Sequence, residues 1–264
     1  MLNILVCVKQ VPDVNLVKID PETGSLIRKG VPAILNPNDE NALEAAVRLK
    51  ERYGGTVTCI TMGPDQAEEA LRECLAAGAD RAVLLSDRAF ANADTLATSY
   101  AIVSAARLLG DFDLVFCGKE SLDGATGQMA SQLAERLGAS QLSCVEEIQE
   151  LNEAARTLTV NRALETGTEL TRSAYPCLLT VEKTNFRPRI PNLKQWKASR
   201  RAEISRYTSH TIPGLDPRRI GDPGSPTKVP RTYPPPVGQR GQMLREESPE
   251  KTVETLLGLL ADVL

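Results

Sequence analysis

The sequence predicts an α/β fold with a mostly parallel sheet and helices on both of its faces. Short apolar runs alternate with helical patterns, beginning with the run Leu2–Val8. A strand–helix alternation of this kind builds a parallel sheet whose crossover helices cover its faces. The 264 residues are 42% hydrophobic, which is enough for a large core without staples.

The elements follow from local patterns. Pro37–Gly54 reads as a helix with Ala42 and Leu49 on one face and glycine at its end. Val17–Arg28 predicts a hairpin that turns at Pro21–Gly24. Further strands are predicted at Thr56–Met62, Arg81–Leu85 and Leu114–Cys117, and further helices at Asp65–Gly78, Asp94–Leu109 and Gln128–Leu137.

The pattern changes after Gly138. Thr157–Ala163 and Glu169–Ser173 predict a β-hairpin, and Pro176–Val181 predicts another buried strand. Residues 183–206 then hold eight Lys or Arg and one acid, and residues 213–241 are rich in Pro and Gly. We therefore predict a nucleotide-binding domain over 1–182 and an extended arm over 183–264 that lies on something else. The arm ends in a helix from about Pro249, with an apolar stripe of Val253, Leu256, Leu257, Leu260 and Val263.

Composition excludes several classes of function. The net charge of −3 argues against a nucleic-acid binder, and no apolar run is long enough to insert into a membrane. The first residues read as a strand and not as a signal peptide, so we expect a cytoplasmic protein. Six cysteines form no C-x-x-C pair, and His210 is the one histidine, so neither a metal site nor a catalytic triad is expected. Any redox chemistry must come from a bound cofactor.

Polar loops follow the predicted strands. In an open parallel sheet, ligands bind beyond the carboxyl ends of the strands, so these loops are expected to converge on one site. The loops are Val8–Asp13, Asn36–Asp39, Met62–Pro64, Ser86–Thr95 and Gly118–Gln128.

The loop Gly118–Gln128 carries the strongest single signal. Gly118, Gly124 and Gly127 permit close backbone approach to a ligand, and Thr126 offers a hydroxyl. The helix that follows presents free amides to a phosphate. The loop matches neither G-x-G-x-x-G nor a P-loop, so an ordinary glycine-rich turn remains an equal alternative.

A second signal is the helix start at Asp94–Ser99. Asp94 occupies the N-cap position, while Thr95 and Thr98 add hydroxyls to the first turn. The stretch is either an ordinary capped helix or a cradle for a diphosphate. Asp94 would repel a phosphate directly, so it must cap the helix or orient a donor.

Other positions leave two interpretations open. Lys9 either pairs with a phosphate or is solvated, and Met62 either packs or contacts an adenine. Arg88 and Phe90 either line a pocket for a flavin or nicotinamide, or they belong to a surface loop. The basic segment around Trp196 is a solvated arm, a protein-docking surface or, least favoured, a nucleic-acid patch.

Several motifs in order resemble the beta subunit of electron transfer flavoproteins. They are V-K-Q-V-P-D (8–13), N-P-N-D-E-N-A-L-E-A-A (36–46), M-G-P-x-x-A-E-E-A-L-R (62–72), G-A-D-R-A-V-L-L-S-D-R (78–88), A-D-T-L-A-T-S (93–99), G-K-x-x-x-D-G-x-T-G-Q (118–128) and G-S-P-T-K-V (224–229). The resemblance covers nearly the whole chain and implies an adenine nucleotide alpha hydrolase-like fold.

The resemblance implies a heterodimer with an alpha subunit. Ordinary members carry AMP on the beta subunit, whereas electron-bifurcating members carry an FAD there that takes hydride from NADH. That FAD divides the electrons between ferredoxin or flavodoxin and a second FAD on the alpha subunit. The second route leads to a partner dehydrogenase, acyl-CoA dehydrogenase-like or a quinone oxidoreductase. The segment D-R-A-F-A-N-A-D-T-L-A-T-S (87–99) resembles the bifurcating branch, in which this helix start holds the FAD diphosphate.

The resemblance also implies the contact residues. Ile190 and Pro191 match the family's recognition loop for a dehydrogenase. Ala125 and Met129 depart from the Asp and Val that many bifurcating members carry, and an AMP-binding carrier and a universal-stress-type module are the rivals. The expected cofactor contacts are Cys7, Val8, Lys9, Pro12, Asn36, Asp39, Met62, Asp87, Arg88, Ala89, Phe90, Asp94, Thr95, Thr98, Gly118, Lys119, Asp123, Gly124, Ala125, Thr126, Gly127 and Gln128.

Overall fold

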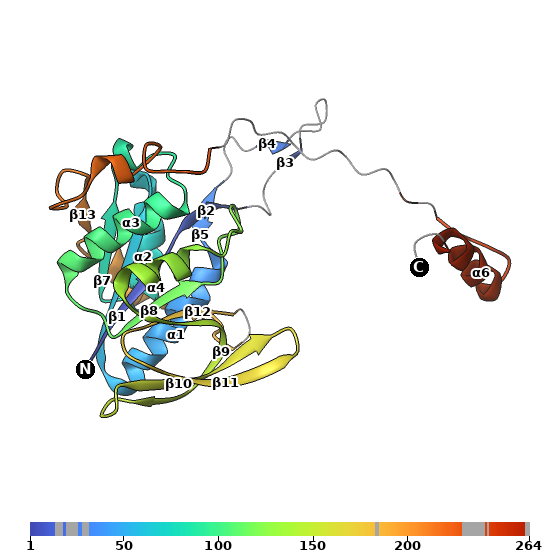
Figure 1. Ribbon diagram of the computed structural model, residues 1–264, viewed down its shortest axis with the longest axis horizontal. Coiled ribbons are helices and arrows are strands. Elements are labelled where there is room, and N and C mark those ends of the chain that lie inside the picture. Colours follow the sequence, from blue (N-terminus) through green and yellow to red (C-terminus); the bar gives the residue numbers. More distant parts are fainter. Residues whose placement is uncertain are drawn as a thin grey trace. The chain divides into compact units, whose positions relative to one another are not determined.

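The computed structural model describes residues 1–13, 18–19, 26–27, 32–182, 185–228, 241 and 243–261. Within these residues, one nine-stranded sheet has the order β11-β10-β9-β12-β8-β1-β6-β7-β13 (Figure 1). The predicted α/β fold is confirmed. The strands are β1 (Leu2–Cys7), β6 (Gly55–Met62), β7 (Arg81–Leu85), β8 (Leu114–Gly118), β9 (Ser140–Asn152), β10 (Thr157–Leu164), β11 (Gly167–Ala174), β12 (Cys177–Val181) and β13 (Ser205–Tyr207).

The centre of the sheet is parallel and buried on both faces. β1 pairs in parallel with β6 and β8, β6 pairs in parallel with β7, and β8 pairs in parallel with β12. Successive residues point to opposite faces, so Ile4 and Val6 join one apolar core while Leu5 joins the other. The first core contains α1 (Pro37–Tyr53) and α2 (Glu68–Ala77), and the second contains α3 (Thr95–Ala106) and α4 (Met129–Leu137).

One long strand of the sheet has no counterpart in the sequence prediction. β9 pairs in parallel with β12 and antiparallel with β10, and so joins the β10–β11 hairpin to the sheet. Its pattern is hard to read because only Leu142, Val145 and Leu151 are buried among polar residues. A positive φ of 57° at Cys144 and register shifts in both pairings further break its alternation.

Residues 185–228 contain two elements that the arm prediction lacks. α5 (Leu193–Ser199) starts with a capping box between Asn192 and Gln195, and β13 pairs in parallel with the edge strand β7. Ile212 and Ile220 are buried in the second core. This part of the predicted arm therefore lies on the chain's own sheet. A three-residue strand and a seven-residue helix are too short for a clear periodic signal.

Smaller elements complete the fold. β2 (Gln10–Pro12) pairs antiparallel with β5 (Ala33–Leu35), and β3 (Lys18–Ile19) pairs with β4 (Leu26–Ile27) as the predicted hairpin requires. The turn predicted at Pro21–Gly24 lies outside the described residues.

The chain divides into two compact units, residues 1–18 with 27–230 and residues 19–26 with 231–264. In the second unit, α6 (Pro249–Leu260) is capped by Ser248 and exposes Val253, Leu256, Leu257 and Leu260. The predicted stripe therefore lies on a helix, although Val263 is outside the described residues. The wrapping of an alpha subunit by residues 183–264 stays a prediction. No helix in the described part of the chain combines the length and apolarity that a membrane span requires.

Candidate functional site

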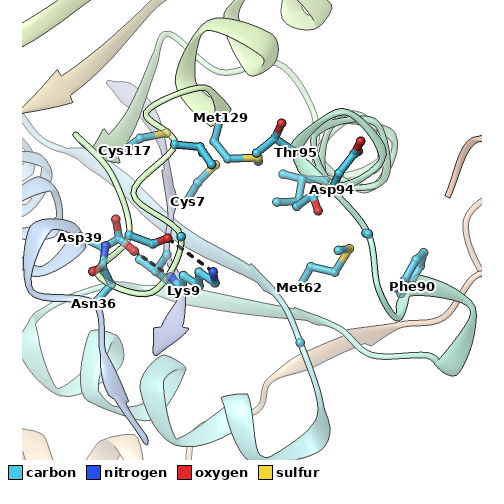
Figure 2. Close-up of a pocket in the computed structure, with 18 of the residues that line it drawn as sticks. Cys7, Lys9, Asn36, Asp39, Met62, Phe90, Asp94, Thr95, Cys117 and Met129 are labelled. Carbon is cyan, nitrogen blue, oxygen red and sulfur yellow. Dashed lines mark hydrogen bonds between the residues drawn. The ribbon is translucent and has the colours of Figure 1, made fainter. Parts of the chain in front are cut away.

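A cavity of about 760 Å³ lies where the predicted loops converge. The carboxyl ends of β1, β6, β7 and β8 open into it, together with the starts of α1, α3 and α4. Figure 2 shows Asn36, Asp39 and Lys9 on one side of this space and Phe90 on the other, with Met62 between them. The volume is within the range of cofactor sites.

Most predicted contact residues line this one cavity. They are Cys7, Val8, Lys9, Asn36, Asp39, Met62, Asp87, Arg88, Phe90, Asp94, Thr95, Thr98, Gly118, Lys119, Gly124, Thr126, Gly127 and Gln128. Pro12, Ala89, Asp123 and Ala125 do not line it. Pro12 lies on β2, and Ala89 donates its amide to Asp87. Ala125 has a φ of 45° in the turn that begins at Ser121.

Asp39 joins three elements beneath the cavity. Its Oδ2 accepts the amide of Lys9 at 2.8 Å, and its Oδ1 accepts the amide of Gly118 at 3.1 Å. Burial raises the pKa of Asp39 to about 7, although the hydrogen bonds from Lys9, Asn36 and Gly118 oppose the rise. The carboxyl group thus connects the ends of β1 and β8 to the first turn of α1.

Two asparagines fix the glycine-rich loop after β8. The side-chain amides of Asn36 and Asn38 donate to the carbonyl of Glu120, at 3.0 and 2.8 Å. The amide of Leu122 donates back to Asn36 Oδ1 at 3.2 Å. These bonds fix the loop against the start of α1.

The lysines at the cavity are already paired with acids. Lys9 Nζ lies 2.7 Å from Asp123 Oδ1, and Lys119 Nζ lies 2.9 Å from Glu182 Oε1. Lys9 is therefore ion-paired and not simply solvated, and its pairing with a phosphate stays a prediction. Asp123, which the resemblance placed at the cofactor, pairs with the Lys9 side chain and does not line the cavity, and its contact with a cofactor stays a prediction.

The start of α3 is capped as the sequence predicts. Asp94 Oδ1 accepts the amide of Ala97 at 3.0 Å, and Asp94 Oδ2 accepts the amide of Thr227 at 3.0 Å. Burial acts to raise the pKa of Asp94, but these amides hold it below its usual value. The amide of Asp94 donates to Ser225 Oγ at 2.8 Å. The carboxylate is thus occupied within the protein, and the Thr95 and Thr98 side chains line the cavity.

Thr95 links the starts of α3 and α4. Its hydroxyl donates to Gln128 Oε1 at 3.2 Å and accepts from Gln132 Nε2 at 3.1 Å. Within the residues that the structure describes, no side chain caps α4, whose N-cap is Gln128, so its first amides remain available at the cavity wall. Two helix N-termini therefore meet the cavity beside the same threonine.

The far end of the cavity lies beside β7. Phe90 is 5% exposed, which selects the pocket over the surface-loop interpretation for this residue, while Arg88 is exposed at the rim. Asp87 accepts hydrogen bonds from Ser209 and from the amide of Ala89, and the Ser209 bond is the main reason that its pKa lies below the ordinary value. This carboxylate ties the rim to the segment after β13.

Comparison with known proteins identifies the family. The electron transfer flavoprotein domain model matches residues 23–211. The electron transfer flavoprotein subunit beta of Thermoanaerobacterium thermosaccharolyticum is 45% identical over 259 residues, covering 97% of this chain and 98% of the relative. The chain belongs to the electron transfer flavoprotein beta-subunit family.

Two further relatives carry more specific names. The caffeyl-CoA reductase-Etf complex subunit CarD of Acetobacterium woodii is 44% identical over 262 residues, covering 99% of this chain and 98% of the relative. Protein FixA of Bradyrhizobium diazoefficiens is 40% identical over 258 residues, covering 96% of this chain and 89% of the relative.

The cavity is also lined by several residues that were not among the expected cofactor contacts. Ile102, Leu133 and Cys117 give the cavity an apolar base, and Met129 and Ala130 extend it. Cys117 lies directly opposite Cys7 in the β1–β8 register. Apolar residues of this kind are typical of helix and strand cores. Only the placement of α3 and α4 over the strand ends shows that these residues line a cavity.

The predicted docking residues lie outside this cavity. Ile190 is 95% exposed, next to an arginine that is held firmly. Arg189 Nε lies 2.7 Å from Glu44 Oε2, and Arg189 Nη2 lies 2.9 Å from Glu51 Oε2. Binding of a dehydrogenase at Ile190 and Pro191 stays a prediction.

Proposed function

We propose that this chain is the beta subunit of an electron-bifurcating electron transfer flavoprotein and that its cavity binds FAD in place of AMP. One observation carries the proposal. A single cavity extends from Asp39 and the Gly118–Gln128 loop to the α3 start at Asp94–Thr98 and on to Phe90. A mononucleotide needs one anion cradle, whereas two helix N-termini and two threonine hydroxyls suit a diphosphate.

The residues present fit this cofactor in three respects. Thr98 and the uncapped start of α4 offer donors to phosphate oxygens, and the Thr95 hydroxyl would do so by exchanging its bond to Gln128 Oε1 for one to phosphate. The apolar base and Phe90 provide surface for an aromatic ring system. The carboxylates of Asp94 and Asp87 are occupied by amide or hydroxyl donors, which reduces their repulsion of an anion.

FAD bound here supplies the redox chemistry, which is acceptance of hydride from NADH and delivery of electrons to two acceptors. The protein's own groups bind and orient. Thr95 and Thr98 position the diphosphate, Phe90 excludes water from the flavin ring system, and Met62 packs at the adenine end. Asp39 and Asn36 keep the glycine-rich loop closed around the nucleotide end.

The partners follow from the same proposal. An alpha subunit with its own FAD completes the heterodimer, and ferredoxin or flavodoxin takes the low-potential electron. The other electron passes through the alpha-subunit FAD to a dehydrogenase, acyl-CoA dehydrogenase-like or a quinone oxidoreductase. The printed name of the CarD relative, which places that protein in a reductase–Etf complex, supports an assembly of this kind.

The first test is the nucleotide content of the co-expressed heterodimer, measured by acid release and chromatography. We expect two FAD and no AMP per heterodimer, and reduction of the bound flavin by NADH. One FAD and one AMP would contradict the proposal and make the chain part of a non-bifurcating carrier.

The diphosphate assignment has its own mutational test. Thr95→Val with Thr98→Val removes two hydroxyls that each contribute about 1.5 kcal/mol to binding an anion, so FAD affinity is expected to fall about 100-fold. The measurement is FAD retained per heterodimer after dialysis, with alpha-subunit flavin as internal reference.

Two further variants test whether the loss of FAD affinity comes from the cavity hydroxyls. Thr98→Val alone avoids the Gln128–Thr95–Gln132 contacts, and should lose about tenfold in affinity. Ser104→Ala removes a hydroxyl from the same helix away from the cavity, where Ser104 bonds only the Tyr100 carbonyl in the described structure, and should retain FAD. Equal FAD retention in all variants would place the diphosphate elsewhere.

A further inference from the structure

Four arginines gather on the outer side of the α3 and α4 helices. Arg107, Arg136, Arg218 and Arg219, called here the arginine patch, come from the end of α3, from α4 and from the turn at Pro217–Arg219. Three of them border a hollow of about 370 Å³ that is separate from the cofactor cavity. That hollow is lined by Leu96, Arg136, Arg218, Arg219, Pro223, Gly224, Ser225 and Pro226.

The positive charge of the patch is poorly neutralised. Arg218 pairs with Asp216, but within the described part of the chain Arg107, Arg136 and Arg219 make no ion pair. Arg107 instead donates to the carbonyl of Arg136, and Arg136 donates to Ser99 Oγ and the Leu96 carbonyl. Burial and the nearby charges of Arg219 and Arg107 lower the pKa of Arg136. Like charges held together in this way favour an anionic partner.

The guanidinium groups are also held in place. The guanidinium carbons of Arg219 and Arg136 lie 4.1 and 5.5 Å from the centroid of the Tyr100 ring. Tyr100 is itself fixed, since its hydroxyl accepts the amide of Asp216 at 3.0 Å. Pre-oriented cations lose little side-chain entropy when a partner binds.

The patch adjoins the wall of the cofactor cavity. Arg136 lies one helical turn after Gln132, which bonds Thr95 in the cavity wall. Leu96 follows Thr95, and Ser225 bonds the amide of Asp94. A protein docked on the patch would therefore stand one helix away from the bound cofactor.

We propose that the arginine patch docks a small acidic electron-carrier protein. The inference rests on the proposed function, because it names the surface at which the low-potential acceptor would bind. The surface suits a protein more than a small anion. The Arg218 side chain is 87% exposed, and the cations are interspersed with exposed Leu96 and prolines, as in the arginine-rich interfaces that proteins form.

The test uses the co-expressed heterodimer with Arg218→Gln and Arg219→Gln, and a ferredoxin of strongly negative net charge as the probe. The matched control is Arg52→Gln with Arg172→Gln, which also removes two exposed cations, one of them near an aromatic ring. Ferredoxin binding is measured by biolayer interferometry over a range of NaCl concentrations. Ferredoxin reduction by NADH is measured alongside, together with flavin reduction by NADH alone.

We expect the patch variant to bind ferredoxin about tenfold or more weakly at low salt, with a smaller salt dependence. KM for ferredoxin should rise by a similar factor, while kcat, flavin content and direct flavin reduction stay as in the wild type and the control. Unchanged ferredoxin affinity would overturn the inference, as would loss of the alpha subunit from the variant, which would assign the patch to the subunit interface. If the wild type binds ferredoxin through the patch but does not oxidise NADH, the proposed function fails and the docking surface stands.

Discussion

Replacing Gly118 by alanine is expected to lower the free energy of unfolding by about 3 kcal/mol or more and to abolish nucleotide retention. An alanine Cβ at this position would lie 2.5 Å from Asp39 Oδ1 and 2.6 Å from the Asn38 carbonyl carbon. These atoms belong to the first turn of α1, so the end of β8 would have to separate from the helix. The separation would also break the hydrogen bond from the Gly118 amide to Asp39.

Two other glycines in the same loop provide graded controls. At Gly124 a Cβ would come no closer than 3.3 Å to the Ser121 hydroxyl, so alanine should be nearly neutral. At Gly127 there is space, but the φ of 60° costs an alanine about 1 kcal/mol. Unfolding midpoints and nucleotide content of the three heterodimers should follow this order. A Gly118→Ala protein as stable as Gly124→Ala would show that the approach of β8 to α1 is not close enough to require glycine.

The sequence predicted the parallel core because each of its strands carries a strong local signal. Leu2–Val8 and Thr56–Met62 are apolar runs, and the helices between strands end at glycines such as Gly54 and Gly78. β9 was not predicted because only three of its thirteen residues are buried and they do not alternate regularly with the others. β13 was not predicted because its formation depends on pairing with the edge strand β7, and no local sequence pattern encodes that pairing.

The candidate site also has a part that the sequence predicts and a part that it does not. Loops at the carboxyl ends of strands converge in any parallel sheet, so the lining from Asn36, Met62 and Gly118 could be predicted. The pairing of Lys9 with Asp123 could not, because it joins residues that only the folded loop brings together. The apolar base formed by Ile102 and Leu133 could not be predicted either. A buried side chain and a side chain that lines a pocket give the same helical pattern in the sequence.

The Asp39→Asn variant is expected to be less stable than the wild type by an amount that shrinks as the pH rises. Burial raises the pKa of Asp39 to about 7 in the folded protein, from an ordinary value of 3.8. The folded state therefore holds this proton more tightly than the unfolded chain. The contribution of Asp39 to stability is greatest at about pH 4 and decreases towards pH 7, by at most about 1.4 kcal/mol per pH unit.

An asparagine side chain has the same shape as the aspartate that it replaces but does not titrate. It presents one oxygen and one NH₂ group to the amides of Lys9 and Gly118, so one of those hydrogen bonds is lost at a cost of about 1–3 kcal/mol. The pKa values of Asp87, Asp94 and Asp123 are lowered, and their stabilisation is lost only as the solution becomes strongly acidic. Because the variant keeps these three groups, their effects cancel in the comparison.

The measurement is the difference between the unfolding midpoints of wild-type and Asp39→Asn heterodimers from pH 5 to pH 8, at fixed protein and nucleotide concentration. Gly124→Ala serves as a reference that should show no pH-dependent difference from the wild type. A difference that narrows with rising pH would mean that the cost of burying the ionised carboxylate of Asp39 outweighs its hydrogen bonds from the Lys9 and Gly118 amides. A difference that widens with rising pH would mean that the Lys9 and Gly118 amides outweigh burial and keep Asp39 ionised, as the Ala97 and Thr227 amides do for the capping carboxylate of Asp94.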